Sequence, residues 1–513
     1  MLVQIIAAKC IGIDAVRVLV EVEIDRGVGI HLCGLADTAV KESLLRTVTA
    51  LQAIGYRIPG KKIVINLAPA DLQKNGSGYD LPIAVGIIAA SGQAELPLAA
   101  AFLVMGELGL DGSVRDIAGA LPFTELAGKE KLRGAILPAG CALEASELKD
   151  IDVYAVRHLS EAVRVLSGVP CPELLVREAA RDIVSPAGAG PGQDLADIIG
   201  QEGARRGIEI AAAGGHNILM LGAPGAGKSS LAKAIAGILP PLTREEALVT
   251  SKIYSIAGKG NLRCGLMWER PFRAPHYSAS LASMIGGGGG DNILPGEVSL
   301  AQNGVLFLDE VAQMPRSVIE ALRGPLEERN VHISRLRSKV DFPASFMLVA
   351  AANPCPCGYW GEGDRCRCSP SQRLNYLSRL SGPLMDRIDI QLWVRPVGSS
   401  QLASRVRSEP SAAVAARVRA ARDIQHRRFA GEPVGTNAEM TNKQLARFCR
   451  LDDSCRQTML RLMERTGLSM RAYFRIIKVA RTSADLAGEP EILPAHLLEA
   501  AGFRFLDRPD AFE

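Results

Sequence analysis

The chain has 513 residues with 59 Lys and Arg against 55 Asp and Glu, and 48% of its residues are hydrophobic. These proportions are typical of a globular chain of about three domains and exclude an intrinsically disordered protein. The longest apolar run, 81–90, is too short for a membrane span, which needs about 18 residues. The start, MLVQIIAAKC, lacks the basic segment of a signal peptide, so we expect a cytoplasmic protein with no membrane partner.

The chain divides into two α/β units joined by a linker and followed by a helical region. Residues 1–168 contain Val or Ile at every second position from 16 to 24, which predicts a half-buried strand. A helix is expected after Asp37, a strand at 62–68 and another helix near Asp80. Residues 169–192 contain four prolines and end in SPAGAGPG, which is typical of a linker. The second α/β unit covers 193–396, with strands expected at 217–221, 304–309 and 346–353, and 397–513 is expected to be helical.

A phosphate-binding motif lies between a strand and a helix of the second unit. Residues 222–229, GAPGAGKS, match the pattern G-x-x-x-x-G-K-[ST]. In such loops backbone N–H groups surround phosphate oxygens, and the helix N-terminus adds positive potential. Lys228 is expected to contact the β- and γ-phosphates, and the Ser229 hydroxyl is expected to bind Mg²⁺. The expected nucleotide-binding residues are Gly222, Ala223, Pro224, Gly225, Ala226, Gly227, Lys228, Ser229, Ser230 and Asp309.

Polar residues follow two further strands of this unit. Asp309 and Glu310 come directly after the apolar run 305–308. The Asp is expected to hold Mg²⁺, and the Glu to orient and polarise the attacking water. A pair of acids at a helix N-terminus would give the same pattern. Asn353 ends the strand SFMLVAAANP, where an amide can position water, although Asn before Pro is also common in turns.

The order of these motifs resembles an AAA+ ATPase of the magnesium-chelatase-like branch, and within that branch the YifB/ComM family. The resemblance extends over essentially the whole chain and is carried by RPFRAPHYSASLASMIGGGG at 270–289, PGEVSLAQNGVLFLDE at 295–310, SGPLMDRIDI at 381–390 and SMRAYFRIIKVARTSADL at 469–486. It implies ATP and Mg²⁺ as ligands and a homo-oligomeric ring, usually of six subunits. It also implies DNA, branched or single-stranded, as the partner.

The resemblance assigns roles to three more polar residues. Asn353 matches the first sensor, and Arg387 matches the arginine finger that reaches the ATP of a neighbouring subunit. Arg471 matches the second sensor, on a helical lid. Arginine fingers in phosphoryl-transfer systems contribute about 10³–10⁵ in turnover. Ordinary surface ion pairs are the alternative for both arginines.

Two basic features are candidates for DNA contact. VHISRLRSKVDF at 331–342 predicts a β-hairpin with Arg335, Arg337 and Lys339 at its tip, which the resemblance would place in the pore of the ring. Between 401 and 481 there are 17 Lys and Arg against 7 Asp and Glu. Both patterns favour contact with a polyanion. An exposed turn and a solvated helix face are the alternatives.

Four of the eleven cysteines are clustered in CPCGYWGEGDRCRC at 355–368. Disulfides are uncommon in a cytoplasmic chain, and four thiolates from Cys355, Cys357, Cys366 and Cys368 suit a structural Zn²⁺ ion with no open coordination position. An iron–sulfur cluster and a redox pair of cysteines are alternatives. Tyr359 and Trp360 within this loop could stack on bases or pack against the loop itself.

The segment IVINLAPADLQKNGSGYDLPIAVGIIAASG at 63–92 resembles the proteolytic domain of Lon. Lon-type proteolysis needs a Ser nucleophile and a Lys base. Alignment on KNGSGY puts Gly78 at the serine position, and SVRDIAGAL puts Leu121 at the lysine position. We therefore expect a scaffold or DNA-binding platform and no peptidase activity.

The sequence thus predicts a fold of three parts: a Lon-protease-like α/β domain, an AAA+ P-loop α/β domain and a helical lid. The resemblance implies an ATP-driven branch-migration helicase in homologous recombination, notably during natural transformation. A chelatase-type motor and a protein-remodelling ATPase are the alternatives that do not act on DNA. An ATP-dependent protease is a third, opposed by Gly78 and Leu121.

Overall fold

Apolar residues at every second position build the N-terminal sheet. Val18, Val20 and Val22 are fully buried, as are Ile63 and Ile65 on the neighbouring strand. The seven strands run in the order β3-β4-β2-β1-β5-β8-β9. Their bounds are β1 Leu2–Ile11, β2 Asp14–Asp25, β3 Gly29–Cys33, β4 Lys62–Ala68, β5 Phe102–Val104, β8 Gly134–Pro138 and β9 Asp152–Val156. The strand predicted at 62–68 is β4.

Helices cover this sheet and complete the first core. The helix expected after Asp37 is α1, and the Asp37 side chain caps it by accepting a hydrogen bond from the N–H of Val40 at 2.8 Å. The helix expected near Asp80 is α2, which is almost wholly buried. The helices of this unit are α1 Thr38–Ala53, α2 Asp80–Ala90, α3 Ala120–Lys129, α4 Ala139–Ala142 and α5 Leu159–Leu166, and a small hairpin joins β6 Glu107–Leu108 to β7 Val114–Arg115. The chain still pairs with β9 as far as Val176, whose N–H donates to the carbonyl of Val153 at 2.8 Å.

The second sheet is entirely parallel and has the order β11-β14-β17-β10-β18. Its strands are β10 Ile218–Leu221, β11 Phe272–Arg273, β14 Val305–Leu308, β17 Met347–Ala352 and β18 Ile390–Trp393. Three of them are the strands predicted at 217–221, 304–309 and 346–353. All four residues of β10 are buried, as expected for a central parallel strand. Because the strands are parallel, their carboxyl ends meet at one edge, where α/β proteins bind ligands.

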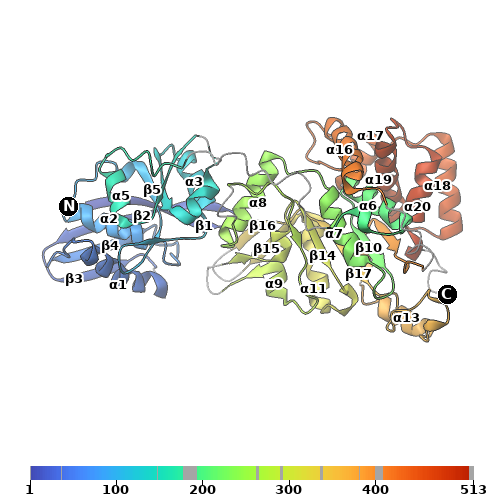
Figure 1. Ribbon diagram of the computed structural model, residues 1–513, viewed down its shortest axis with the longest axis horizontal. Coiled ribbons are helices and arrows are strands. Elements are labelled where there is room, and N and C mark those ends of the chain that lie inside the picture. Colours follow the sequence, from blue (N-terminus) through green and yellow to red (C-terminus); the bar gives the residue numbers. More distant parts are fainter. Residues whose placement is uncertain are drawn as a thin grey trace.

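Helices and two hairpins surround this second sheet (Figure 1). The predicted basic hairpin is formed by β15 Asn330–Ser334 and β16 Lys339–Pro343, and a second hairpin by β12 Gly286–Gly287 and β13 Leu294–Pro295. The helices are α6 Glu202–Gly214, α7 Lys228–Ile238, α8 Arg244–Ile256, α9 Leu281–Ile285, α10 Glu297–Leu300, α11 Arg316–Ala321, α12 Arg323–Glu328, α13 Pro370–Leu377 and α14 Gly382–Met385.

The C-terminal part is helical, as predicted. It contains α16 Ser411–Arg428, α17 Asn442–Phe448, α18 Asp453–Thr466, α19 Met470–Ala487 and α20 Pro494–Gly502, which lie at the end of the molecule opposite to the N-terminal unit (Figure 1). A buried histidine connects these helices to the sheet. His216 Nδ1 lies 3.3 Å from Asp389 Oδ2, and its Nε2 lies 2.8 Å from Thr482 Oγ1 on α19. The C-terminal helices are therefore anchored at the start of β10.

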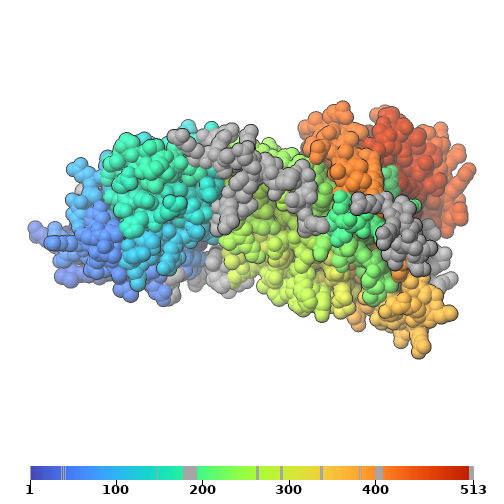
Figure 2. Space-filling view, viewed as in Figure 1, coloured from blue at the N-terminus to red at the C-terminus, as the bar shows by residue number. Residues whose placement is uncertain are grey.

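The N-terminal unit packs directly on the second unit, mainly through α8. The buried Lys252 ammonium lies 2.8 Å from Asp14 Oδ1 and 2.5 Å from Glu125 Oε2. The turn between β1 and β2 also reaches the β15–β16 hairpin, because a Cβ atom on Gly12 would lie 2.9 Å from the carbonyl oxygen of Asp341. In the space-filling view the cyan and green parts of the surface adjoin (Figure 2).

The computed structural model describes residues 2–35, 37–146, 148, 150–176, 193–260, 265–288, 293–334, 339–380, 382–398 and 408–507. The expected DNA contacts Arg335 and Arg337, and most of the predicted linker, lie outside these residues. Among the described helices, none combines the length and the apolar character that a membrane crossing requires.

Candidate nucleotide-binding site

The phosphate-binding motif forms a loop at the carboxyl end of β10, which lies between β17 and β18 in the sheet. Strand β10 ends at Leu221 and helix α7 begins at Lys228. Gly227, which precedes the helix, has φ of 95°, a conformation that residues with a side chain rarely adopt. The first N–H groups of α7 have no partner within the helix, so its N-terminus is suited to an anion.

The Lys228 ammonium is held above this loop. Only 8% of Lys228 is exposed. Its Nζ donates hydrogen bonds to the carbonyls of Gly222 at 2.6 Å and Ala223 at 3.0 Å, and to Asn353 Oδ1 at 3.2 Å. Burial lowers the pKa of Lys228, and the nearby carboxylates of Asp309 and Glu310 oppose this shift. The three acceptors fix the ammonium where the loop approaches β17.

Asp309 and Ser229 meet at the same edge of the sheet. The Ser229 hydroxyl donates to Asp309 Oδ2 at 3.0 Å. Hydroxyl and carboxylate oxygens are the ligands that Mg²⁺ prefers, so the pair fits the expected magnesium site. Glu310 follows with φ of 49° and ψ of 40°, and its N–H donates to Asp309 Oδ1 at 2.9 Å. A non-glycine residue in this left-handed conformation is costly, and such strain is concentrated at functional sites.

The structure therefore brings together five of the predicted residues from three different strands. Lys228 and Ser229 follow β10, Asp309 and Glu310 follow β14, and Asn353 follows β17. Sequence reasoning missed Tyr376 on α13. Burial raises the pKa of Tyr376, and the nearby Glu310 carboxylate raises it further, which places the phenol close to this cluster. A single tyrosine in a short helix carries no signal of such a position.

Arg387 and Arg471 lie at the opposite edge of the sheet. The Arg387 carbonyl accepts a hydrogen bond from Asn217 Nδ2 at 2.9 Å, and Asn217 precedes β10. Arg387 forms an ion pair with Glu327 on α12. Arg471 donates to Asp386, the residue before Arg387. The two arginines are thus adjacent to each other and separated from the phosphate loop by the length of β10.

Positive charge is concentrated around Arg387. Burial lowers the pKa of Arg387, and the guanidinium groups of Arg323, Arg475 and Arg471 lower it further. Four arginines on three elements therefore lie within electrostatic reach of one another. The carboxylates of Glu327, Asp386 and Asp389 pair with these guanidinium groups, so the cluster keeps a small excess of positive charge.

The four clustered cysteines converge as their spacing predicted. Their sulfur atoms all lie within 4.8 Å of one another. Cys355 Sγ is 3.3 Å from that of Cys357 and 3.8 Å from that of Cys366. Sulfur atoms bound to one tetrahedral Zn²⁺ at about 2.3 Å are separated by roughly 3.8 Å, so the donor set fits zinc. Although burial opposes it, the N–H of Tyr359 and the neighbouring thiols lower the pKa of Cys357 to about 6.

The aromatic residues of the cysteine loop pack within the protein. The ring of Trp360 lies edge-on to that of Trp393, with 5.4 Å between centroids. The guanidinium of Arg365, in the same loop, lies 4.1 Å from the centre of the Tyr359 ring. Of the two uses considered for these rings, the structure supports packing.

Most of the arginines that the structure describes in the basic C-terminal region have partners within the protein. Arg417 contacts Glu409 at 2.5 Å and Glu209 at 2.6 Å. Arg428 forms an ion pair with the buried Asp485. The local excess of positive charge is thus largely used in intramolecular contacts. Of the predicted hairpin tip, the described residue is Lys339, which is exposed at the start of β16.

Of the two positions that correspond to the protease dyad, Gly78 is half-buried and Leu121 is buried in the N-terminal core. A Cβ atom on Gly78 would lie 3.0 Å from Met105 Cε. Leu121 is fully buried on α3, where its N–H lies 3.4 Å from the Ser255 hydroxyl. Ser77, one residue from the serine position, donates instead to Glu107. The apolar side chain of Leu121 thus occupies the position of the lysine base.

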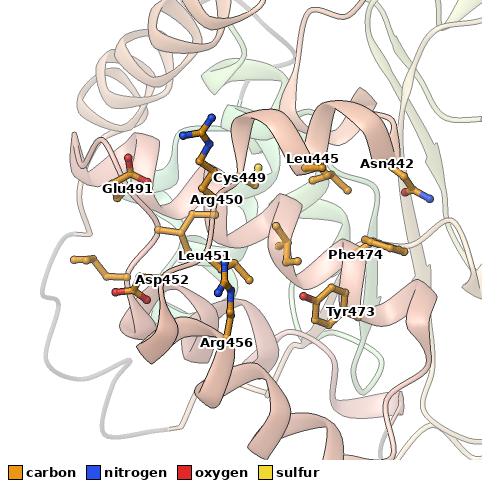
Figure 3. A pocket seen from close by; sticks show the side chains of 14 residues that line it. Asn442, Leu445, Cys449, Arg450, Leu451, Asp452, Arg456, Tyr473, Phe474 and Glu491 are labelled. Carbon is orange, nitrogen blue, oxygen red and sulfur yellow. The ribbon is translucent and has the colours of Figure 1, made fainter.

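The C-terminal helices enclose a separate hollow of about 730 Å³ between α17, α18 and α19 (Figure 3). Tyr473, Phe474 and Leu445 form an apolar wall, with Arg450 and Arg456 at its side. Its lining comes from residues 442–493 alone, so it is distinct from the nucleotide-binding candidate.

Family models and relatives agree with this architecture. The model for magnesium chelatase subunit ChlI matches residues 194–402, a second model for that subunit matches 20–140, and the model for its C-terminal region matches 408–504. Over 82 residues, 16% of this chain and 12% of the other protein, the chain is 43% identical to the archaeal Lon protease of Methanothermobacter thermautotrophicus.

Two relatives match almost the whole chain. The protein YifB of Salmonella typhimurium is 42% identical over 503 residues, which cover 97% of this chain and 96% of that protein. The competence protein ComM of Haemophilus influenzae is 43% identical over 503 residues, with the same coverage. The chain therefore belongs to the YifB/ComM family of magnesium-chelatase-like AAA+ proteins.

Proposed function

We propose that this chain hydrolyses ATP at the carboxyl edge of its parallel sheet. The observation that carries the proposal is the meeting of Lys228, Ser229, Asp309, Glu310 and Asn353 at one point from three strands. Each supplies a group that phosphoryl transfer needs, and the loop and helix α7 supply backbone donors for phosphate oxygens.

Each of these residues has a separate role in hydrolysis. Lys228 and the loop N–H groups bind the phosphates and stabilise charge on the transferred group. Glu310 orients the attacking water and accepts its proton, while Asn353 positions the water or the terminal phosphate. Ser229 and Asp309 would hold Mg²⁺, which neutralises the charge of the β- and γ-phosphates when bound.

We propose further that the active form is a ring in which Arg387 and Arg471 serve the ATP of the neighbouring subunit. The Arg387 backbone lies beside Asn217, before β10, whereas the phosphate loop follows β10, whose four residues span about 13 Å at about 3.3 Å each. A hydrogen bond to phosphate requires about 3 Å, so the cluster acts in its own site only after a large rearrangement. Repeated head-to-tail contacts that close on themselves generate a ring, and six subunits are expected from the family resemblance.

DNA, branched or single-stranded, is the proposed partner, and branch migration in recombination is the proposed activity. Three observations support this: the competence role in the name of the Haemophilus influenzae relative, the exposed Lys339, and the contact between the β15–β16 hairpin and the N-terminal unit. Arginines of the C-terminal region form ion pairs within the protein, so this region is a weaker candidate for the DNA-binding surface. A chelatase-type or protein-remodelling ATPase is the alternative, favoured by the match to the chelatase subunit.

The four cysteines are proposed to bind a structural Zn²⁺ ion. The convergence of the four sulfur atoms within 4.8 Å supports this. With four thiolate ligands the metal has no open position, so its contribution is to the fold of the loop.

The proposal is tested by measuring ATP turnover of the purified chain without DNA and with single-stranded, duplex and four-way-junction DNA. Lys228→Ala serves as the blank for contaminating activity. We expect turnover to rise with DNA, most strongly with the junction. Turnover that is clear but equal under all four conditions would contradict the DNA proposal and favour a protein or chelatase partner.

A further inference from the structure

The cysteine loop is packed against the phosphate loop. It begins two residues after Asn353, whose side chain accepts the hydrogen bond from Lys228. It then returns to the phosphate loop at Gly358, where a Cβ atom would lie 2.9 Å from Pro224 Cδ and 3.0 Å from Pro224 Cγ. The backbone of Gly358 is therefore in direct contact with the phosphate-binding motif. The loop is attached to the nucleotide site by chain connection and by packing.

A second contact fixes the other side of the cysteine loop. A Cβ atom on Gly361 would lie 2.7 Å from Trp393 Cζ2, at the end of β18. Trp393 also packs edge-on against Trp360 and against Phe505, with centroid distances of 5.4 Å and 5.7 Å. The loop thus lies across the carboxyl edge of the sheet, from the end of β17 to the end of β18.

Regular secondary structure contributes little to the shape of this loop. Between Cys357 and Cys366 the regular structure consists of one short 3₁₀ turn, Gly363–Arg365. Gly358, Gly361 and Gly363 all have positive φ, so the segment is costly to order. A metal bound by all four thiolates closes the loop and supplies the free energy that orders it.

We infer that a thiophilic divalent metal at Cys355, Cys357, Cys366 and Cys368 holds the phosphate loop and Asn353 in place, so that ATP affinity depends on occupancy of the cysteine site. This inference rests on the proposed binding of ATP and zinc. The metal has no contact with the nucleotide. It acts through Gly358 on Pro224 and through the short connection from Cys355 to Asn353.

Two glycine variants of the full chain distinguish the effect of metal binding from the effect of the contact between the cysteine loop and the phosphate loop. Gly358→Ala adds a methyl group against Pro224, and Gly363→Ala adds one where nothing lies within 4 Å. Both positions have positive φ, 84° and 58°, so both variants carry backbone strain and only one disturbs the contact. Cys366→Ser removes a metal ligand. Zinc per chain is measured by elemental mass spectrometry, and affinity is measured with a fluorescent ATP analogue and Mg²⁺.

We expect one zinc ion per wild-type chain. Cys366→Ser should lose zinc and bind the analogue at least about tenfold more weakly, since the loss of one hydrogen bond to a charged phosphate lowers affinity by about that factor or more. Gly358→Ala should keep zinc but lose affinity for the ATP analogue to a similar extent. Gly363→Ala should keep both zinc and the wild-type affinity for the analogue. Chelator treatment of the wild-type chain should reproduce the loss of affinity, and zinc should restore it, which keeps the test valid if Cys366→Ser does not fold.

Several results would overturn the inference. They are a wild-type chain without zinc, a zinc-depleted chain that binds the analogue normally, and equal affinities of the two glycine variants. Failure of the proposed function gives a different pattern, because wild-type and Lys228→Ala would then bind the analogue equally weakly whatever their zinc content.

Discussion

The position of Arg387 predicts that two inactive variants restore each other's activity. Arg387→Ala removes the guanidinium of a residue whose backbone lies at the amino end of β10, a strand that spans about 13 Å to the phosphate loop of the same chain. Lys228→Ala removes the phosphate-binding ammonium but leaves Arg387 intact. We expect each variant alone to lose about 10³-fold or more in turnover.

Mixing the two variants creates interfaces with both groups intact. A site is complete when its own chain carries Lys228 and the neighbouring chain carries Arg387. In a randomly mixed one-to-one ring of any size, about one quarter of the interfaces meet this condition. Turnover of the mixture, followed by phosphate release, should therefore approach a quarter of the wild-type value if the sites act independently.

The control for this experiment is subunit exchange, measured by energy transfer between chains labelled with two dyes. A mixture that exchanges subunits but stays as inactive as its parents would refute action between subunits. Wild-type turnover by Arg387→Ala alone would refute the role of Arg387 altogether.

Four further predictions follow from individual contacts. Glu310→Gln should bind ATP normally but turn it over about a hundredfold more slowly, because an amide cannot accept the proton of the attacking water; nucleotide binding and phosphate release measure the two effects. Gly78→Ser should change the free energy of unfolding by less than about 1 kcal/mol in urea titrations, because Met105 Cε, 3.0 Å from the added Cβ, is the end of a flexible side chain, and the variant should not cleave casein. Lys252→Met should lower the free energy of unfolding by about 1 kcal/mol in urea titrations, because the carboxylates of Asp14 and Glu125 lose their cation. An unchanged urea midpoint would argue against that contact. Although burial opposes it, the hydrogen bond with His216 lowers the pKa of Asp389 from 3.8 to about 2. The ionised Asp389 therefore stabilises the fold above about pH 4, and this stabilisation is lost as the pH falls toward 2. Asp389→Asn should reduce the difference between the urea unfolding midpoints measured at about pH 5 and at about pH 3.

Local signals were sufficient for much of the fold and for the centre of the site. Alternating and buried apolar runs located β4 and the strands that carry Gly222, Asp309 and Asn353. The phosphate motif and the cysteine spacing each constrain a few consecutive residues, so their geometry follows from the sequence. Asp309 and Asn353 each follow a strand of one parallel sheet, so both lie at its carboxyl edge.

The relations that depend on sheet order and distant partners could not be predicted in this way. Nothing in the spacing of Arg387 or Arg471 indicates that both lie at the amino edge, since that depends on which strand pairs with β10. Counting charges in the C-terminal region overestimated its free positive charge, because the partner of Arg428 is Asp485, on a different helix. The contact between Gly358 and Pro224 joins residues more than a hundred positions apart and leaves no sequence pattern.

The central claim, that ATP hydrolysis at this site drives movement along DNA, is tested most directly by the conversion of a synthetic four-way junction into duplex products. The account predicts conversion by the wild-type chain with ATP and Mg²⁺. It predicts none by Glu310→Gln, which should still bind both ATP and the junction. Rapid ATP turnover by the wild-type chain in the presence of a bound junction that stays intact would contradict the account.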